Sequence, residues 1–158
     1  MKRGFTLIEI LIYIALLVLM LLLIINTTLS FTGSYRPVAA LRTADRAAVS
    51  SMERLTREIR LATAATVDTS STTANTLTLT AGSTITEFYV DNGVLKVDIN
   101  GTFSGPLTPS GAWVTDLDFA VIDNGNSKAV KVDMVVNGVS GQTTITKKFH
   151  TTVVMKGI

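Results

Sequence analysis

One acidic residue lies in a stretch of sequence where a charged side chain is energetically costly. Glu9 lies at the start of a long apolar stretch near the N-terminus, and residues 10–25 carry no charge. A carboxylate near the middle of a membrane-spanning helix costs about 2.5–3.5 kcal/mol on insertion scales. Glu9 therefore needs either a place near the membrane surface or a partner that offsets this cost.

The apolar stretch has the length of a membrane span. From Phe5 to Ile25 it is interrupted only by Thr6 and Glu9, and it contains no Gly or Pro. At about 1.5 Å per residue, such a helix would be roughly 31 Å long, close to the ~30 Å hydrocarbon core of a bilayer. We therefore expect a transmembrane helix.

Two other interpretations of this stretch are weaker. A core helix that is apolar on every side would need a larger domain around it than this chain provides. A conventional secretory signal has a shorter apolar region without a charge, and residues 28–30 make a poor cleavage site.

The rest of the chain offers little catalytic chemistry. No cysteine is present, which excludes disulfides, cysteine-ligated zinc and cysteine nucleophiles. The single histidine, His150, lies in an alternating pattern typical of a surface strand. No catalytic triad, phosphate loop or nucleotide fingerprint is found, so we expect no enzyme activity.

No cofactor or metal is expected either. Asp116, Asp118, Asp123 and Asn126 lack the order of residues in a calcium loop, and turn chemistry accounts for residues 123–126. The formal net charge is +2, and without the two basic residues at the N-terminus the remaining charges balance at 12 basic and 12 acidic. We therefore expect no strong nucleic-acid binding.

Residues 2–9, KRGFTLIE, resemble the class III signal of type IV prepilins and type II secretion pseudopilins. The resemblance implies that a prepilin peptidase cleaves between Gly4 and Phe5 and methylates the new amine of Phe5. Gly4 has no side chain to block a protease, and Lys2 and Arg3 favour a cytoplasmic N-terminus.

The same resemblance gives Glu9 a partner. In this family the carboxylate pairs with the N-terminal amine of a neighbouring subunit, which would offset the desolvation of both charges. Thr6 would assist by hydrogen bonding. The alternative left open is that Glu9 snorkels to the headgroups or pairs with the amine of its own chain.

The second part of the helix is predicted to be amphipathic. Apolar residues recur at spacings of three and four along one face: Leu41, Ala44, Ala48, Met52, Leu55, Ile59 and Ala62. This stripe should pack against the C-terminal domain. Pro37 should kink or break the helix, because it removes one backbone donor.

The remaining sequence predicts an antiparallel sheet. Alternating strands are separated by turn sequences at residues 91–93, 123–126 and 137–138. The expected fold class is α+β, with a long N-terminal helix packed against a C-terminal β domain. The expected parts are a leader (1–4), a transmembrane half of the helix (5–30), an amphipathic half (31–65), a linker (66–75) and the β domain (76–158).

The order of these parts resembles J-type minor pseudopilins and W-type minor pilins. The matching stretches are MERLTREIRLA, FYVDNGVLK, WVTDLDFAVID and AVKVDMVVNG. The likeness implies a structural subunit of a type IV pilus-like or type II secretion filament, with other pilin or pseudopilin subunits as partners. The precursor would cross the bacterial inner membrane once, with its N-terminus in the cytoplasm and its β domain outside, before joining an extracytoplasmic filament.

A different class of function stays open. The chain could be a membrane-anchored binding module, whose β domain recognises DNA, a surface or a secreted substrate.

Overall fold

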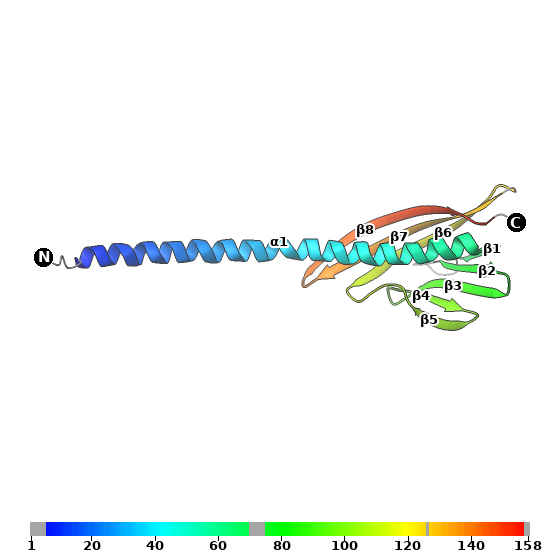
Figure 1. Ribbon diagram of the computed structural model, residues 1–158, viewed down its shortest axis with the longest axis horizontal. Coiled ribbons are helices and arrows are strands. Elements are labelled where there is room, and N and C mark those ends of the chain that lie inside the picture. Colours follow the sequence, from blue (N-terminus) through cyan, green and yellow to red (C-terminus); the bar gives the residue numbers. More distant parts are fainter. Residues whose placement is uncertain (1–5, 70–74, 126, 157–158) are drawn as a thin grey trace. The chain divides into compact units, whose positions relative to one another are not determined.

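The computed structural model describes residues 6–69, 75–125 and 127–156, and it describes the side chains of all of these except residues 32–34 (Figure 1). The chain forms two compact units, residues 1–36 and 37–158. The helix α1, Leu7–Leu61, contributes to both units.

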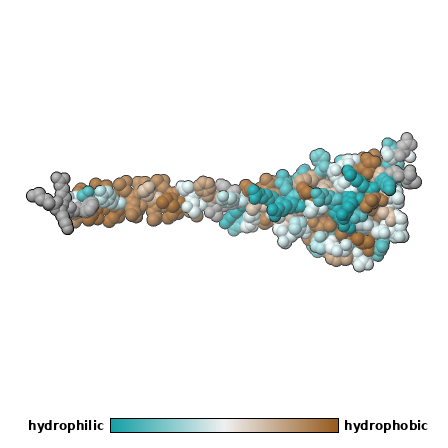
Figure 2. Space-filling view, viewed as in Figure 1, coloured by the Kyte–Doolittle hydropathy of each residue, from teal (hydrophilic) through white to brown (hydrophobic). Residues whose placement is uncertain are grey.

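The N-terminal unit consists of the first part of α1. Apolar residues cover its surface (Figure 2), and the described side chains from Thr6 to Phe31 are exposed, with the exception of half-buried Glu9. Its most apolar 18-residue window has a mean hydropathy of 3.1 and no buried residue. By length and composition this helix is a candidate membrane span, as the sequence predicts.

Pro37 does not break the helix. α1 is continuous over 55 residues and contains Pro37 in its interior. A proline removes a single backbone donor, and the residues on both sides keep helical geometry, so the prediction of a break was wrong.

The C-terminal unit adds two antiparallel sheets to the second part of α1. The first sheet has the strand order β1-β2-β3-β4-β5, and the second has the order β6-β7-β8. The strands are β1 Ala64–Asp68, β2 Thr76–Ala81, β3 Thr84–Asp91, β4 Val94–Ile99, β5 Thr102–Pro106, β6 Ala112–Asp123, β7 Lys128–Ser140 and β8 Thr143–Val154. This layout confirms the expected α+β class.

The core of this unit lies between α1 and the two sheets. The predicted stripe is buried at its alanines, at Leu55 and at Ile59, while Leu41 and Met52 are half-buried. The helix packs with inward residues of both sheets, among them Phe88, Leu95, Leu117 and Met134.

One part of the predicted linker is a strand. Residues 66–75 were expected to connect helix and sheet, but β1 starts at Ala64, and α1 ends at Leu61 rather than at residue 65. The backbone N–H and the hydroxyl of Thr63 both donate to the carbonyl oxygen of Thr80, at 2.8 and 3.0 Å, which starts the pairing of β1 with β2. The alternation in β1 is too short to stand out in the sequence.

One of the predicted turns is confirmed and another is wrong. Asn92 and Gly93 form the predicted tight turn between β3 and β4, both with positive φ (51° and 75°). Asn137 and Gly138, in contrast, lie inside β7, so the prediction of a turn there was wrong. Gly138 instead allows a close approach of β7 to the helix.

Candidate functional site

The residues of the expected cleavage site lie outside the described part of the chain. These are Lys2, Arg3, Gly4 and Phe5. Thr6 and Glu9 are described, and they lie together at the beginning of α1.

Thr6 and Glu9 form part of a capping box. The carbonyl oxygen of Thr6 accepts hydrogen bonds from the backbone N–H groups of Glu9 (3.1 Å) and Ile10 (3.3 Å). In return, the backbone N–H of Thr6 donates to Oε2 of Glu9 at 3.5 Å. A glutamate three residues after a helix-capping threonine commonly makes this contact. The spacing Thr-x-x-Glu, which is visible in the sequence, is the signal that could have predicted this contact.

Tyr13 is a second partner of Glu9. Its hydroxyl donates to Oε1 of Glu9 at 3.4 Å, from one helical turn further along α1. Residues four apart lie on the same face of a helix, so the contact is local. Tyr13 was not predicted from the sequence, where the only signal was an acid and a phenol four residues apart.

The position of the Glu9 carboxylate at the beginning of the helix is electrostatically favourable. The N-terminus of a helix carries a partial positive charge, which favours a nearby carboxylate. Each carboxylate oxygen has one described donor of its own chain, whereas an ionised carboxylate has about four acceptor positions. The group can therefore accept a further cationic donor without losing its present contacts.

Two threonine hydroxyls further along the apolar helix bond to the backbone of their own helix. Thr27 and Thr28 donate from their hydroxyls to the carbonyl oxygens of Leu23 and Ile24, at 2.8 and 2.9 Å. Such bonds to the preceding turn allow hydroxyls to enter lipid at low cost.

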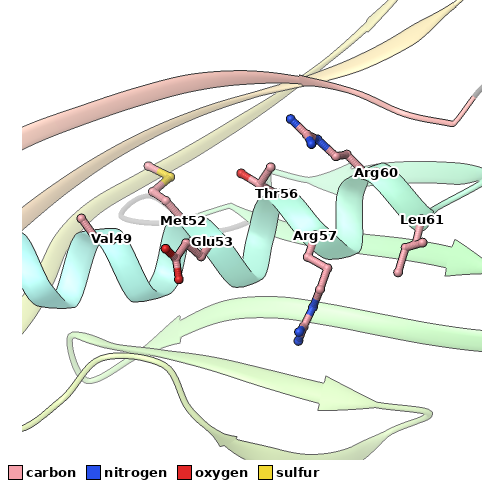
Figure 3. A pocket seen from close by; sticks show the side chains of 7 residues that line it. All are labelled: Val49, Met52, Glu53, Thr56, Arg57, Arg60 and Leu61. Atoms are coloured by element: carbon pink, nitrogen blue, oxygen red, sulfur yellow. The ribbon is translucent and has the colours of Figure 1, made fainter.

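A separate surface lies on the solvent-facing side of α1 in the C-terminal unit. An open trough runs along the helix there, with apolar Val49, Met52 and Leu61 together with Thr56 and the charged Glu53, Arg57 and Arg60 (Figure 3). Nearby, Glu58 pairs with Arg54 at 3.0 Å. This arrangement is an amphipathic helix face and holds no nucleophile–base pair.

The acidic residues of the β domain are scattered over its surface. Asp116 and Asp118 are exposed on β6. His150 is exposed on β8, as the sequence predicts. Asn126 lies outside the described residues. Among the residues that the structure describes, no three acidic or histidine side chains come together in a way that could hold a metal ion.

Asp123 acts in the turn between β6 and β7. Its carboxylate accepts a hydrogen bond from the backbone N–H of Gly125 at 2.9 Å and lies 3.1 Å from Nζ of Lys128. The Gly125 bond, followed by the Lys128 contact, lowers the pKa of Asp123 below its usual value. This geometry is that of a turn, in agreement with the sequence interpretation.

A polar network covers one face of the first sheet. Tyr89 donates to Asp98 at 3.1 Å, and Nζ of Lys96 lies 2.5 Å from Asp91. Partial desolvation and the bond to Asp98 raise the pKa of Tyr89, and the bond to Asp91 raises that of Lys96. Because these residues lie on paired strands, the network stabilises the hairpin of β3 and β4.

Comparison with known proteins bears on the N-terminus. Residues 1–25 match the family model of the prokaryotic N-terminal methylation motif. No curated protein and no solved structure matches the chain. The matched motif supports a type IV pilin-like or pseudopilin precursor that is processed by N-terminal methylation, which implies a prepilin peptidase as a partner. Together with the exposed apolar helix, it fits a membrane-anchored pilin.

Proposed function

We propose that the protein is a structural subunit, a minor pilin or pseudopilin, of a type IV pilus-like or type II secretion filament. The observation that carries this proposal is a methylation motif over residues 1–25, in which the described part is an exposed apolar stretch of helix with Glu9 as its one carboxylate. The protein acts by assembly and catalyses no reaction. The order of helix and strands further favours a J-type minor pseudopilin or W-type minor pilin.

Processing creates the charge that Glu9 requires. Cleavage after Gly4 leaves an amine on Phe5, which is then methylated and remains positively charged. This amine and the carboxylate of Glu9 are each costly in lipid, and a pair between neighbouring subunits offsets part of both costs. The open acceptor positions of Glu9 are consistent with such a pair.

The location of the protein changes during this sequence of events. The precursor spans the bacterial inner membrane with its N-terminus in the cytoplasm and its β domain outside. It then joins other pilin or pseudopilin subunits in an extracytoplasmic filament.

Mass spectrometry after co-expression with a prepilin peptidase tests the processing step. The chain should lose residues 1–4 and gain one methyl group on Phe5. The variant Gly4→Val should be cleaved at least about tenfold more slowly, because a tenfold rate change needs a barrier increase of only about 1.4 kcal/mol. Ala15→Val, in the same helix, serves as the control. An intact N-terminus in the presence of active peptidase would refute this step.

Filament incorporation tests the role of the charge on Glu9. Glu9→Gln keeps a side chain that can cap the helix, because glutamine is also found at this position of capping boxes, but it removes the charge. We expect incorporation into sheared filaments to fall at least about tenfold, the effect of losing roughly 1.4 kcal/mol. Glu53→Gln, on the exposed face of α1, should leave incorporation unchanged. Normal incorporation of Glu9→Gln would contradict the proposed pairing.

A further inference from the structure

We propose that Tyr13 is a positioning residue for Glu9, whose hydroxyl holds the carboxylate at a fixed place on the helix for the amine of the next subunit. This inference rests on the proposed function in filament assembly. It adds a residue outside the Gly4–Glu9 segment to the assembly site.

The contacts place Glu9 between two donors. The backbone N–H of Thr6 reaches Oε2 at 3.5 Å from the preceding turn, and the hydroxyl of Tyr13 reaches Oε1 at 3.4 Å from the following turn. One carboxylate oxygen is thus directed toward each end of the helix. A side chain held in this way loses much of its freedom to swing along the helix surface.

Burial supports the same arrangement. Glu9 is half-buried, whereas the other described side chains from Thr6 to Phe31 are exposed. No second helix or domain covers Glu9 in the described N-terminal unit, so its own neighbours shield it from solvent.

In lipid, the hydrogen bonds from Thr6 and Tyr13 matter more to the Glu9 carboxylate than they would in water. Water is scarce in the hydrocarbon region, so a carboxylate there depends on hydrogen bonds from the protein. Both contacts are long, compared with about 2.5–2.7 Å for a hydroxyl bound to a carboxylate and about 2.7–3.2 Å for a backbone N–H bound to oxygen, so they restrain the group without saturating it. The remaining acceptor positions stay available for an ammonium group.

Tyr13 has a simpler alternative role as an aromatic anchor at the membrane interface. An anchor acts through its ring and its polar hydroxyl together, and its effect does not depend on Glu9. Tyr13→Phe keeps the aromatic ring, and the response of the Glu9 carboxylate itself then separates the two roles. Tyr35→Phe is the matched control, since it makes the same change in the same helix and Tyr35 is also exposed.

The first experiment measures filament incorporation of the full chain in cells that contain the peptidase and the assembly machinery. Tyr13→Phe should reduce the fraction of the protein in sheared filaments about three- to tenfold, as expected for a weak charge-assisted hydrogen bond. Cleavage, methylation and the amount in the membrane should be unchanged, and Tyr35→Phe should behave as wild type. Normal incorporation of Tyr13→Phe would overturn the proposal.

The second experiment observes the carboxylate directly. Infrared spectra of the mature chain in phosphatidylethanolamine–phosphatidylglycerol vesicles contain a Glu9 carboxylate band, which is identified by its loss in Glu9→Gln. Tyr13→Phe should shift this band and Tyr35→Phe should not. An unshifted band would show that the hydroxyl does not act on Glu9, even if incorporation falls.

The two proposals fail in different ways. If Glu9→Gln assembles normally, the proposed charge pair is wrong whatever the spectra show. If Glu9→Gln fails to assemble but Tyr13→Phe assembles normally, only the role of Tyr13 is wrong.

Discussion

At the scale of single residues, Glu9 has two separable roles. It caps the beginning of its own helix through Thr6, and it supplies the charge that the proposed assembly requires. The capping contact explains how a glutamate can be tolerated in the first turn before any neighbour arrives.

Gly138 is important because it has no side chain. A Cβ atom placed there would lie 2.7 Å from the backbone nitrogen and 2.9 Å from the Cβ of Ala44. Ala40 and Ala44 are themselves fully buried. Small residues on α1 and on β7 therefore allow the helix backbone to approach the sheet closely.

We predict that Gly138→Ala destabilises the C-terminal unit by about 2–3 kcal/mol. Alanine is usually better than glycine inside a strand, so a loss of stability would reveal the cost of overpacking against the helix. Denaturant unfolding in detergent micelles measures the change. Ser140→Ala, at the end of the same strand, is the control and should shift stability by less than about 0.5 kcal/mol. Equal or higher stability of Gly138→Ala would contradict the close contact.

The sequence allowed some of these residues to be predicted. Glu9 stood out because a charge in an apolar stretch is conspicuous, and Thr6 was included through the family resemblance. Tyr13 was missed because its role depends on where its hydroxyl points. Gly138 was misinterpreted because an Asn-Gly pair is also the strongest signal for a tight turn, and only the packing of the helix shows the other use.

At the scale of elements, the long strands of the second sheet depend on their turns. β6 and β7 are joined by a turn in which Asp123 bonds Gly125 and lies close to Lys128. The residues Asp123 and Lys128 are also the last pair of the β6–β7 register. The turn thus contributes to fixing the alignment of strands whose inward faces form the core.

This turn makes stability depend on pH. The pKa of Asp123 is lowered in the folded chain, so its contribution is complete above the unfolded value of about 3.8 and is lost as the pH falls through the folded pKa. Asp123→Asn should be slightly less stable than wild type at pH 6, because exposed pairs contribute little, and the difference should shrink below pH 3.8.

Thermal unfolding of both proteins between pH 6 and pH 2 measures this difference. Asp116→Asn, on an exposed position of β6, controls for a general effect of charge. A difference from wild type that stays constant over the whole range would show that the carboxylate charge has no part in the turn.

Periodic patterns determined how well each element could be predicted. The helix stripe and the strands β2 to β4, β6 and β7 have repeated apolar positions. Most of these residues are buried as expected, although Leu41, Met52 and Val90 are half-buried and Val121 is exposed. The first strand has only Ala65 and Val67 as half-buried members, so its pairing with β2 defines it. Pro37 lies inside a helix of 55 residues and does not end it, although it removes one backbone donor.

At the scale of the whole molecule, the two units differ in whether they bury a hydrophobic core. The buried hydrophobic residues of the described chain begin at Ala40 and all lie in the C-terminal unit. The described part of the N-terminal unit has no core of its own and exposes an apolar surface that suits lipid or neighbouring helices. The chain therefore combines a unit that has its own hydrophobic core with an apolar helical segment whose surface suits lipid or neighbouring helices.

We predict that a fragment of residues 37–158 folds without the N-terminal unit and stays in solution. It retains the amphipathic part of α1 and both sheets, so it keeps the core contacts that stabilise the fold. It should give a circular dichroism spectrum with both helix and strand and should unfold in one cooperative step, whereas the full chain should partition into membranes. A fragment of residues 63–158, which lacks the helix and exposes the inner faces of the sheets, is the matched comparison and should aggregate. Non-cooperative unfolding of the 37–158 fragment would show that the apolar segment contributes to folding as well as to anchoring.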